Sequence, residues 1–211
     1  MGQAIARRFL QAKHTVRVWN RSPAASQALV GDGARVVGSV AEAFQGDVVF
    51  SMLGDDNALR AVFLDSGVLD GATPDVVPVH VNMATVSVAF AEEFAEKHAK
   101  RGIAYIAAPV LGRPNVAAAG KLNIMAAGPA DALDRVQPLL DIAGQKTWRF
   151  GEKPASANVA KIAMNFMLAA ACESMGEAAA LASGYGIKPQ ELLIWPLIVC
   201  FPVRCMKGTA S

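Results

Sequence analysis

The sequence predicts an α/β fold: a doubly wound, mostly parallel sheet followed by a region made of helices alone. Two observations predict it. Apolar runs of strand length alternate with helical segments over the first three quarters of the chain, and one long helical segment begins near Pro154. Strands that are apolar along their whole length are typical of parallel sheets, because helices cover both faces of such sheets. We therefore expect one domain over residues 1–152 and a second, helical domain over residues 153–211.

The first domain is predicted from segments whose apolar pattern changes between helix and strand along the chain. Ser22 and Ser87 stand directly before two of the helices, where their hydroxyl groups are expected to cap free backbone N–H groups. The residues from 109 to 121 are expected to form a loop between two strands. Helices are expected at 1–10, 23–30, 55–64, 87–100 and 129–140, and strands at 15–19, 47–53, 76–81, 103–107, 122–127 and 146–150.

The second domain is predicted to centre on one long helix from Pro154 to about Gly184, with a further helix at 189–194. The stretch 192–203 is apolar, but it is too short to span a bilayer and contains two prolines, so it indicates a core segment rather than a membrane anchor. One face of the long helix is expected to be buried between neighbours, because apolar residues recur on it near the helical period: Val159, Ile162, Phe166, Ala170 and Met175.

The composition is that of a soluble globular protein and argues against several other classes of protein. Of the 211 residues, 53% are apolar and 18% are charged, and the net charge of +2 is spread along the chain, which argues against a nucleic-acid partner. Cys172, Cys200 and Cys205 form no metal-ligand pattern, and an odd number of thiols fits a reduced, cytoplasmic compartment. No metal site and no secretion signal are expected. The three histidines are expected at the surface or in loops.

The chain opens on a helix that feeds a strand ending in polar residues, which is the second half of a mononucleotide-binding unit. In a complete unit of the Rossmann type, a strand and a glycine-rich turn come first, and the turn holds a pyrophosphate at the helix N-terminus. Here the first strand and the first two glycines are absent, and Gly2 stands where the third glycine would be. The sequence therefore predicts a Rossmann-like domain that lacks its first strand.

Asn20, Arg21 and Ser22 follow the strand at the position where such domains contact the adenosine ribose. A carboxylate there favours NAD by binding the ribose 2′-hydroxyl, whereas an arginine accommodates the 2′-phosphate of NADP. This chain has no carboxylate at that position, and Arg21 with Ser22 offers donors for a phosphate. The residues favour NADP (NADPH) as the cofactor; the alternative is a polar turn that merely begins the next helix.

Met52, Leu53 and Thr85 follow two further strands and are the next candidate ligands. Ligands of doubly wound sheets lie beyond the carboxyl ends of the strands, so Met52 and Leu53 are expected beside the nicotinamide half of the cofactor. Their alternative role is to close an apolar strand before an Asp-Asp helix cap. Thr85 offers a hydroxyl group to cofactor or substrate, and its alternative role is structural.

The remaining candidates lie further along the chain and would bind substrate or transfer a proton. Gly112 allows close approach of a ligand and Arg113 offers a cation for an anionic group; the alternative for Arg113 is a solvated loop cation. Lys161 and Asn165 are four residues apart and share one face of the long helix. A lysine among apolar residues tends to a lowered pKa, which suits proton transfer; the alternative is a lysine whose amine reaches solvent at the helix edge.

These segments, in this order, resemble the β-hydroxyacid dehydrogenase family. That family includes 3-hydroxyisobutyrate dehydrogenases, glyoxylate/succinic semialdehyde reductases and, more distantly, imine reductases and 6-phosphogluconate dehydrogenase. The resemblance extends from Met1 to about Leu193. It is carried by short motifs at residues 1–6, 18–22, 51–53, 83–87 and 108–110, and by Lys161-x-x-x-Asn165.

The resemblance implies an NADP(H)-dependent oxidoreductase that interconverts a hydroxy compound and its carbonyl, of the 3-hydroxyacid or small aldehyde and keto acid type. Lys161 would then transfer the proton, Asn165 would orient the substrate, and the long helix would mediate a homodimer. Three departures make an imine or a bulkier carbonyl an alternative substrate. The segment Asn82–Thr85 replaces the family's Asp-x-Ser-Thr, Leu111-Gly112-Arg113 replaces Ser-Gly-Gly, and Ala157 replaces a glycine.

Both ends of the chain also depart from the family pattern. The first strand and the Gly-x-Gly turn are missing, and the sequence after about Trp195 no longer resembles the family. A truncated chain of this kind would have impaired catalysis. The alternative functions are therefore a non-catalytic nucleotide-binding remnant and an interaction protein that uses the long helix.

Overall fold

The computed structural model describes the backbone of residues 1–199 and side chains as far as Ile194. The segment predicted from Trp195 onward as a truncated tail, with Cys200 and Cys205, thus has its side chains outside the described residues. The chain divides into two compact units, Met1–Ile162 and Ala163–Ser211. The predicted domain boundary after residue 152 stays a prediction.

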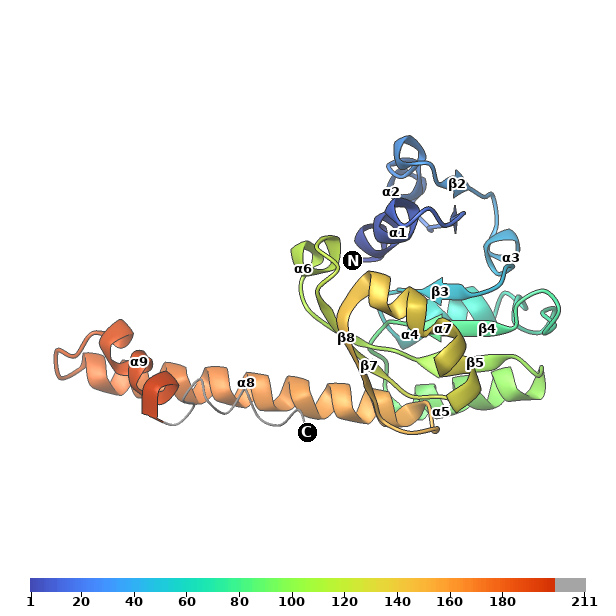
Figure 1. Cartoon of the computed structure of the whole chain (residues 1–211). Helices are drawn as coiled ribbons and strands as arrows, with labels where there is room; N and C mark the ends of the chain where they lie inside the picture. The colour runs from blue at the N-terminus through green and yellow to red at the C-terminus, as the bar shows by residue number, and fades with distance from the viewer. Residues whose placement is uncertain (200–211) are drawn as a thin grey trace, which may run out of the picture. The chain divides into compact units, whose positions relative to one another are not determined.

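The first unit alternates strands with helices, as the sequence predicts (Figure 1). Its strands are β1 (Arg17–Val18), β2 (Arg35–Val36), β3 (Val49–Ser51), β4 (Val79–Asn82), β5 (Ala104–Ala107), β6 (Val110–Leu111), β7 (Leu122–Ala126) and β8 (Gly144–Arg149). Its helices are α1 (Gly2–Gln11), α2 (Pro23–Gln27), α3 (Val40–Ala43), α4 (Asp56–Leu59), α5 (Val88–Lys100), α6 (Pro114–Ala118) and α7 (Ala130–Ala143), with a 3₁₀ turn η1 (Val30–Asp32) and a π-helical turn η2 (Arg60–Leu64).

The strands form three small sheets rather than one continuous sheet. β1 pairs with β2, β3 with β4 and β4 with β5, all in parallel. In the third sheet β7 pairs in parallel with β8 and antiparallel with β6, and a bridge from Ala107 to Ala127 links this sheet to β5. The mostly parallel, doubly wound class is therefore confirmed, with a break between β1 and β3.

Both faces of the β3–β5 sheet are buried, because alternate side chains of each strand enter different cores. Val79 and Val81 of β4 and Ile106 of β5 pack with α1 and α7 on one side. Tyr105 and Ala107 of β5 pack on the other side with side chains of α5 and η2. This two-sided burial explains why the predicted strands read as continuous apolar runs.

Several local predictions are wrong, each for a physical reason. Ser22 directly precedes α2, but its hydroxyl caps no backbone N–H. The predicted loop 109–121 contains β6 and α6, and α6 begins at Pro114, whose fixed φ suits a first helical turn. The expected surface positions of His80 and His98 are also wrong, because both rings are fully buried and bond to each other.

The second unit contains most of α8 (Ala155–Ser183), which begins in the first unit, and α9 (Pro189–Val199). The long helix is confirmed, but its expected buried face is wrong for the single chain: Phe166 is 73% exposed, and Val159, Ile162 and Met175 are exposed as well. Within the described residues, α8 is the one helix long and apolar enough to cross a membrane. Core helices of soluble proteins pass the same test, so this is weak evidence for a membrane span.

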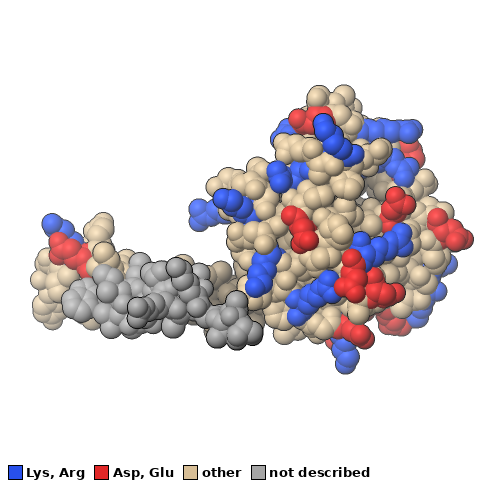
Figure 2. Space-filling view, in the orientation of Figure 1, with Lys and Arg blue, Asp and Glu red and all other residues tan. Residues whose placement is uncertain are grey.

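Charged side chains are interspersed on the face of the molecule seen in Figure 2, where lysine and arginine alternate with aspartate and glutamate. Five of the ion pairs of the first unit lie at its surface, among them Arg7–Asp32 and Arg60–Glu93. Such exposed pairs contribute little to stability. On this face, the basic residues do not gather into one patch.

Candidate functional site

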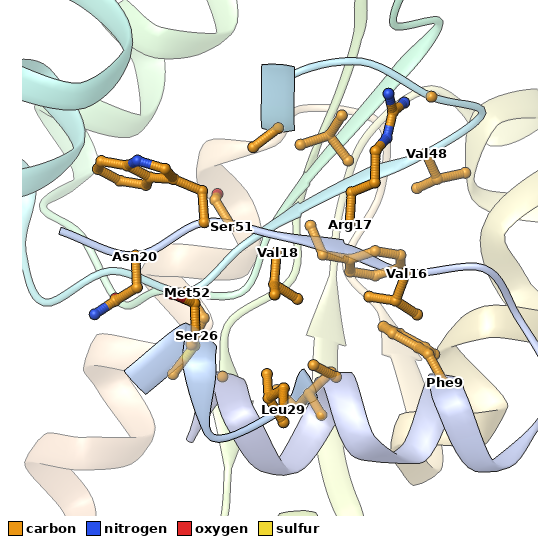
Figure 3. A pocket seen from close by; sticks show the side chains of 18 of the residues that line it. Phe9, Val16, Arg17, Val18, Asn20, Ser26, Leu29, Val48, Ser51 and Met52 are labelled. Carbon is orange, nitrogen blue, oxygen red and sulfur yellow. The ribbon is translucent and has the colours of Figure 1, made fainter. Parts of the chain in front are cut away.

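A cavity of about 640 Å³ lies among α1, β1 and β3. Figure 3 shows its side chains: Phe9 from α1, Val16 and Val18 from around β1, and Leu29 supply apolar walls. Phe9 also packs on Phe50 of β3, with ring centroids 4.8 Å apart. The cavity is thus bounded by two strands that do not pair with each other.

The two strands face the cavity with unpaired edges, since β1 pairs with β2 alone and β3 with β4 alone. A doubly wound nucleotide-binding sheet places a strand between two such neighbours. The break in the sheet therefore coincides with the position of the predicted missing strand.

Four of the predicted cofactor residues line this cavity together: Gly2, Asn20, Met52 and Leu53. Gly2 begins α1 and lies close to Met52, since a Cβ built on it would be 3.6 Å from the Met52 Cβ. No side chain caps the N-terminus of α1, so its first N–H groups are available to an anionic ligand. The N-terminus of α1 and the Met52 side chain thus border the cavity.

Arg21 and Ser22 are exposed and do not line the cavity, although they directly follow Asn20. The Asn20 side-chain amide donates to the Ser22 carbonyl oxygen at 3.0 Å, which shapes the turn and leaves the Arg21 guanidinium in solvent. The structure therefore groups Asn20 with the cavity and places Arg21 and Ser22 beside it.

In the loop between β4 and α5, the backbone N–H groups on both sides of Thr85 are held by hydrogen bonds. The Ala84 N–H donates to the Asn82 Oδ1 at 3.2 Å, and the Val86 N–H donates to the Asn158 Oδ1 at 3.3 Å. Ser87 caps α5, as predicted, by accepting from the Phe90 N–H, and its own N–H and hydroxyl both donate to the Asp56 carboxylate. Thr85 itself is exposed, so its side chain is presented by a well-anchored loop.

Lys161 lies in the second turn of α8 and is 8% exposed. Burial lowers the pKa of its ammonium group from the usual value, because desolvation disfavours the charged form. Within the part of the chain that the structure describes, no carboxylate lies within ion-pair distance of its Nζ. An amine with these properties is suited to accept and donate a proton.

Asn158 is a polar residue that the sequence analysis missed. It precedes Lys161 by three residues, shares the buried side of α8 and is fully buried. Its Oδ1 accepts from Val86, whereas its Nδ2 has no hydrogen-bond partner among the described residues. The i, i+3 spacing to a lysine was the available signal.

The other predicted substrate residues differ from Lys161 in being exposed. Asn165 belongs to the second unit and is exposed. Gly112 and Arg113 lie between β6 and α6, where Arg113 is exposed. Gly112 has a φ of +145°, and a Cβ on it would come within 2.7 Å of Leu122, so the chain's own packing requires a glycine there.

A buried polar cluster beneath the β4–α5 loop was also missed. Its members are Ser51, His80, Asn82, His98 and Tyr105, of which His80, Asn82 and His98 are fully buried. Burial lowers the pKa of His80 well below its usual value and that of His98 to about 4, and it raises the pKa of Tyr105. The cluster was not predicted from the mostly apolar strands that contribute to it. Its polar side chains can be buried because hydrogen bonds within the cluster replace those lost to water.

The family model for the NAD-binding domain of 6-phosphogluconate dehydrogenase matches residues 1–151. An uncharacterized oxidoreductase of Bacillus subtilis, YfjR, is 39% identical over 195 residues, which cover 92% of this chain and 68% of that protein. The chain belongs to the β-hydroxyacid dehydrogenase family.

Other members of the β-hydroxyacid dehydrogenase family support the same assignment. The 3-hydroxyisobutyrate dehydrogenase of Pseudomonas aeruginosa is 32% identical over 91% of this chain and 64% of its own length. The solved structure of the Mycobacterium tuberculosis 3-hydroxyisobutyrate dehydrogenase with L-serine matches with a TM-score of 0.87 and 28% identity, over 95% of this chain and 68% of that one. The chain thus spans about two thirds of the length of these family members. Its first domain is of the kind that binds a nicotinamide dinucleotide.

Proposed function

We infer that this chain is an NADPH-dependent oxidoreductase that interconverts a hydroxy compound and its carbonyl. The observation that carries the proposal is Lys161: a buried lysine with a lowered pKa, one turn from the Asn158 side chain that holds the loop bearing Thr85. Its relatives are named dehydrogenases and oxidoreductases. The substrate class is a 3-hydroxyacid or a small aldehyde or keto acid, in a cytoplasmic enzyme.

In this proposal each predicted residue has one role. When bound, the nicotinamide supplies hydride in reduction and accepts it in oxidation. Lys161 donates the proton to the substrate oxygen from its Nζ in reduction and takes it back in oxidation, and its positive charge stabilises the developing alkoxide. Thr85 and Asn165 hold the substrate, together with Gly112 and Arg113.

The proposed cofactor is NADPH because the turn after β1 offers a cation, Arg21, and a hydroxyl, Ser22, but no carboxylate. Arg21 and Ser22 would bind the 2′-phosphate, while Gly2, Asn20, Met52 and Leu53 contact the rest of the dinucleotide. A relative at 32% identity is named as an NAD-dependent L-serine dehydrogenase, so the two cofactors must be compared directly. Arg21→Ala is expected to weaken NADPH binding by about tenfold or more and to leave NADH binding unchanged. Equal loss for both cofactors would contradict the assignment.

Two alternatives compete with this function. An imine substrate is favoured by the departures at Asn82–Thr85 and by the likeness to an imine reductase from Pseudomonas sp., at 25% identity and a TM-score of 0.79. A non-catalytic remnant or helix-mediated interaction protein is favoured by the broken sheet and by the exposed apolar side chains of α8. A homodimer formed through α8 would cover those side chains.

The test is turnover by the purified chain with NADPH, using small aldehydes, keto acids and cyclic imines in parallel. Lys161→Ala is expected to lower kcat by about 10²–10⁴-fold with unchanged NADPH affinity, because proton transfer is lost. Lys153→Ala, at an exposed position before α8, is the matched control and should retain full activity. Undiminished turnover by Lys161→Ala would overturn its role, and absence of turnover by the unaltered chain would favour the remnant.

A further inference from the structure

The starting point is the side-chain amide of Asn82, which ends β4 and is held in one orientation. Its Oδ1 accepts from the Ala84 N–H at 3.2 Å, and its Nδ2 donates to the Tyr105 hydroxyl at 3.2 Å. Exchanging the amide oxygen and nitrogen would place two donors against each other at Ala84. The Asn82 oxygen therefore points both to the Thr85 loop and to Ser51, whose Oγ is 3.0 Å away.

The proton positions in the cluster follow from one backbone carbonyl. The His98 Nδ1 is 2.7 Å from the Phe94 carbonyl oxygen, which only accepts, so His98 carries a proton on Nδ1. In a neutral ring the His98 Nε2 must then accept, and the His80 Nδ1, at 2.8 Å, must donate to it. The His80 Nε2 consequently accepts from the Ser51 hydroxyl, also at 2.8 Å.

In the neutral cluster the single hydroxyl hydrogen of Ser51 lies between two acceptors, the His80 Nε2 at 2.8 Å and the Asn82 Oδ1 at 3.0 Å. Ser51 therefore links the two histidines to the Asn82 amide. One added proton reverses every step: His98 donates to His80, His80 donates to Ser51, and Ser51 donates to Asn82.

The surroundings keep the cluster neutral near pH 7. Aromatic rings contact the two imidazoles from several elements, namely Phe44 after α3, Phe63 of η2, Phe94 of α5 and Tyr105 of β5. Tyr105 is the titratable side chain among them, and burial raises its pKa, so it stays uncharged. The neighbouring rings therefore supply no charge to stabilise an imidazolium.

We propose that Ser51, His80 and His98 form a buried relay that positions the Asn82 amide and, through Asn82, the loop that presents Thr85. The relay joins the end of β3 to the end of β4 and to α5, so it fixes two cofactor-facing strand ends relative to each other. These three are positioning residues, since they act through Asn82. The functional meaning of the loop rests on the proposed function, but the relay itself is testable without cofactor or substrate.

The first measurement is the ¹⁵N NMR spectrum of the histidine rings of the unaltered full chain at pH 7. Both His80 and His98 are expected to be neutral with the proton on Nδ1, as the contacts require. A proton on the Nε2 of His80 would overturn the relay. Because nothing is bound in this measurement, its outcome is independent of whether the chain turns over a substrate.

The second measurement is amide hydrogen exchange of the Thr85 loop in Ser51→Ala. This change removes the link between His80 and Asn82, and we expect the Ala84 amide to exchange at least about tenfold faster. Ser66→Ala is the matched control, because the Ser66 hydroxyl bonds to the Val62 carbonyl outside the cluster. Equal exchange rates in the two variants would overturn the proposal.

A second variant keeps the test decisive if Ser51→Ala does not fold. Tyr105→Phe removes the hydroxyl that accepts from the Asn82 Nδ2 and leaves the ring in place. Faster exchange of the Ala84 amide in this variant, with the ring tautomers of both histidines unchanged, is the expected result. An unchanged Ala84 amide in Tyr105→Phe would contradict the positioning role of Asn82.

Discussion

Two helices with apolar side chains, α5 and α8, differ in how far the structure buries them. In α5, Phe90, Ala91, Phe94 and His98 are buried against β5 and the neighbouring helical turns. In α8, the buried residues are Ala157, Asn158 and Lys161, all in its first two turns, while the larger apolar side chains further along are exposed. The more apolar of the two helices, α8, is therefore the less buried one.

The difference shows what an apolar period can and cannot establish. A period predicts that a helix has a face to bury, but the partner that buries it is a property of the tertiary structure. α5 finds its partner in the sheet of the first unit. Most of the exposed part of α8 belongs to the second unit, and its apolar side chains are the reason for proposing a partner such as a second copy of the chain.

The largest expected effect, on the free energy of unfolding, tests the difference in burial between these two helices. Phe94→Ala should lower the free energy of unfolding by about 3–5 kcal/mol, since Phe94 is fully buried among aromatic rings and its removal leaves a cavity. Phe166→Ala should change it by less than about 0.5 kcal/mol under conditions where the chain is monomeric, because the ring is 73% exposed. Urea unfolding followed by circular dichroism measures both.

The same pair of variants also tests the proposed dimer. If the chain dimerises through α8, Phe166→Ala should weaken association in light scattering while leaving the monomer stable. A comparable loss of monomer stability in both variants would show that the Phe166 ring is buried within the single chain, and the contrast between the helices would then fail.

The second effect concerns the histidine of α5 and depends on pH. The pKa of His98 is lowered from 6.5 to about 4, so the unfolded chain binds a proton that the folded chain does not over that interval. Stability is therefore retained above pH 6.5 and lost as the pH falls towards 4, by up to about 3 kcal/mol. Thermal unfolding from pH 7 to pH 4 should show a falling Tm. The slope should be shallower in His98→Phe and unchanged in His14→Gln, which alters an exposed histidine.

The same distinction, between a pattern in the sequence and the partners that the tertiary structure supplies, decided what could be predicted of the fold and the site. The strands β3, β4, β5 and β7 were evident because they are buried on both faces, whereas β2 and β6 have two residues each and carry no period. Lys161 was predicted because a lysine among apolar residues is conspicuous. The burial of His80 and His98 was missed, since it depends on partners distant in the sequence.

The smallest effect concerns the first turn of α5 rather than its buried face. Ser87→Ala should destabilise the chain by about 1 kcal/mol, because it removes an N-cap that also bonds to Asp56. Ser22→Ala is the matched control: Ser22 occupies the same position before α2 but makes no capping bond, so its loss should be close to neutral. Equal effects of the two variants on urea unfolding would show that the capping bond of Ser87 does not stabilise the chain. A larger effect for Ser87 would show that α5 is fixed at its first turn as well as along its buried face. The exposed length of α8 has no such buried face.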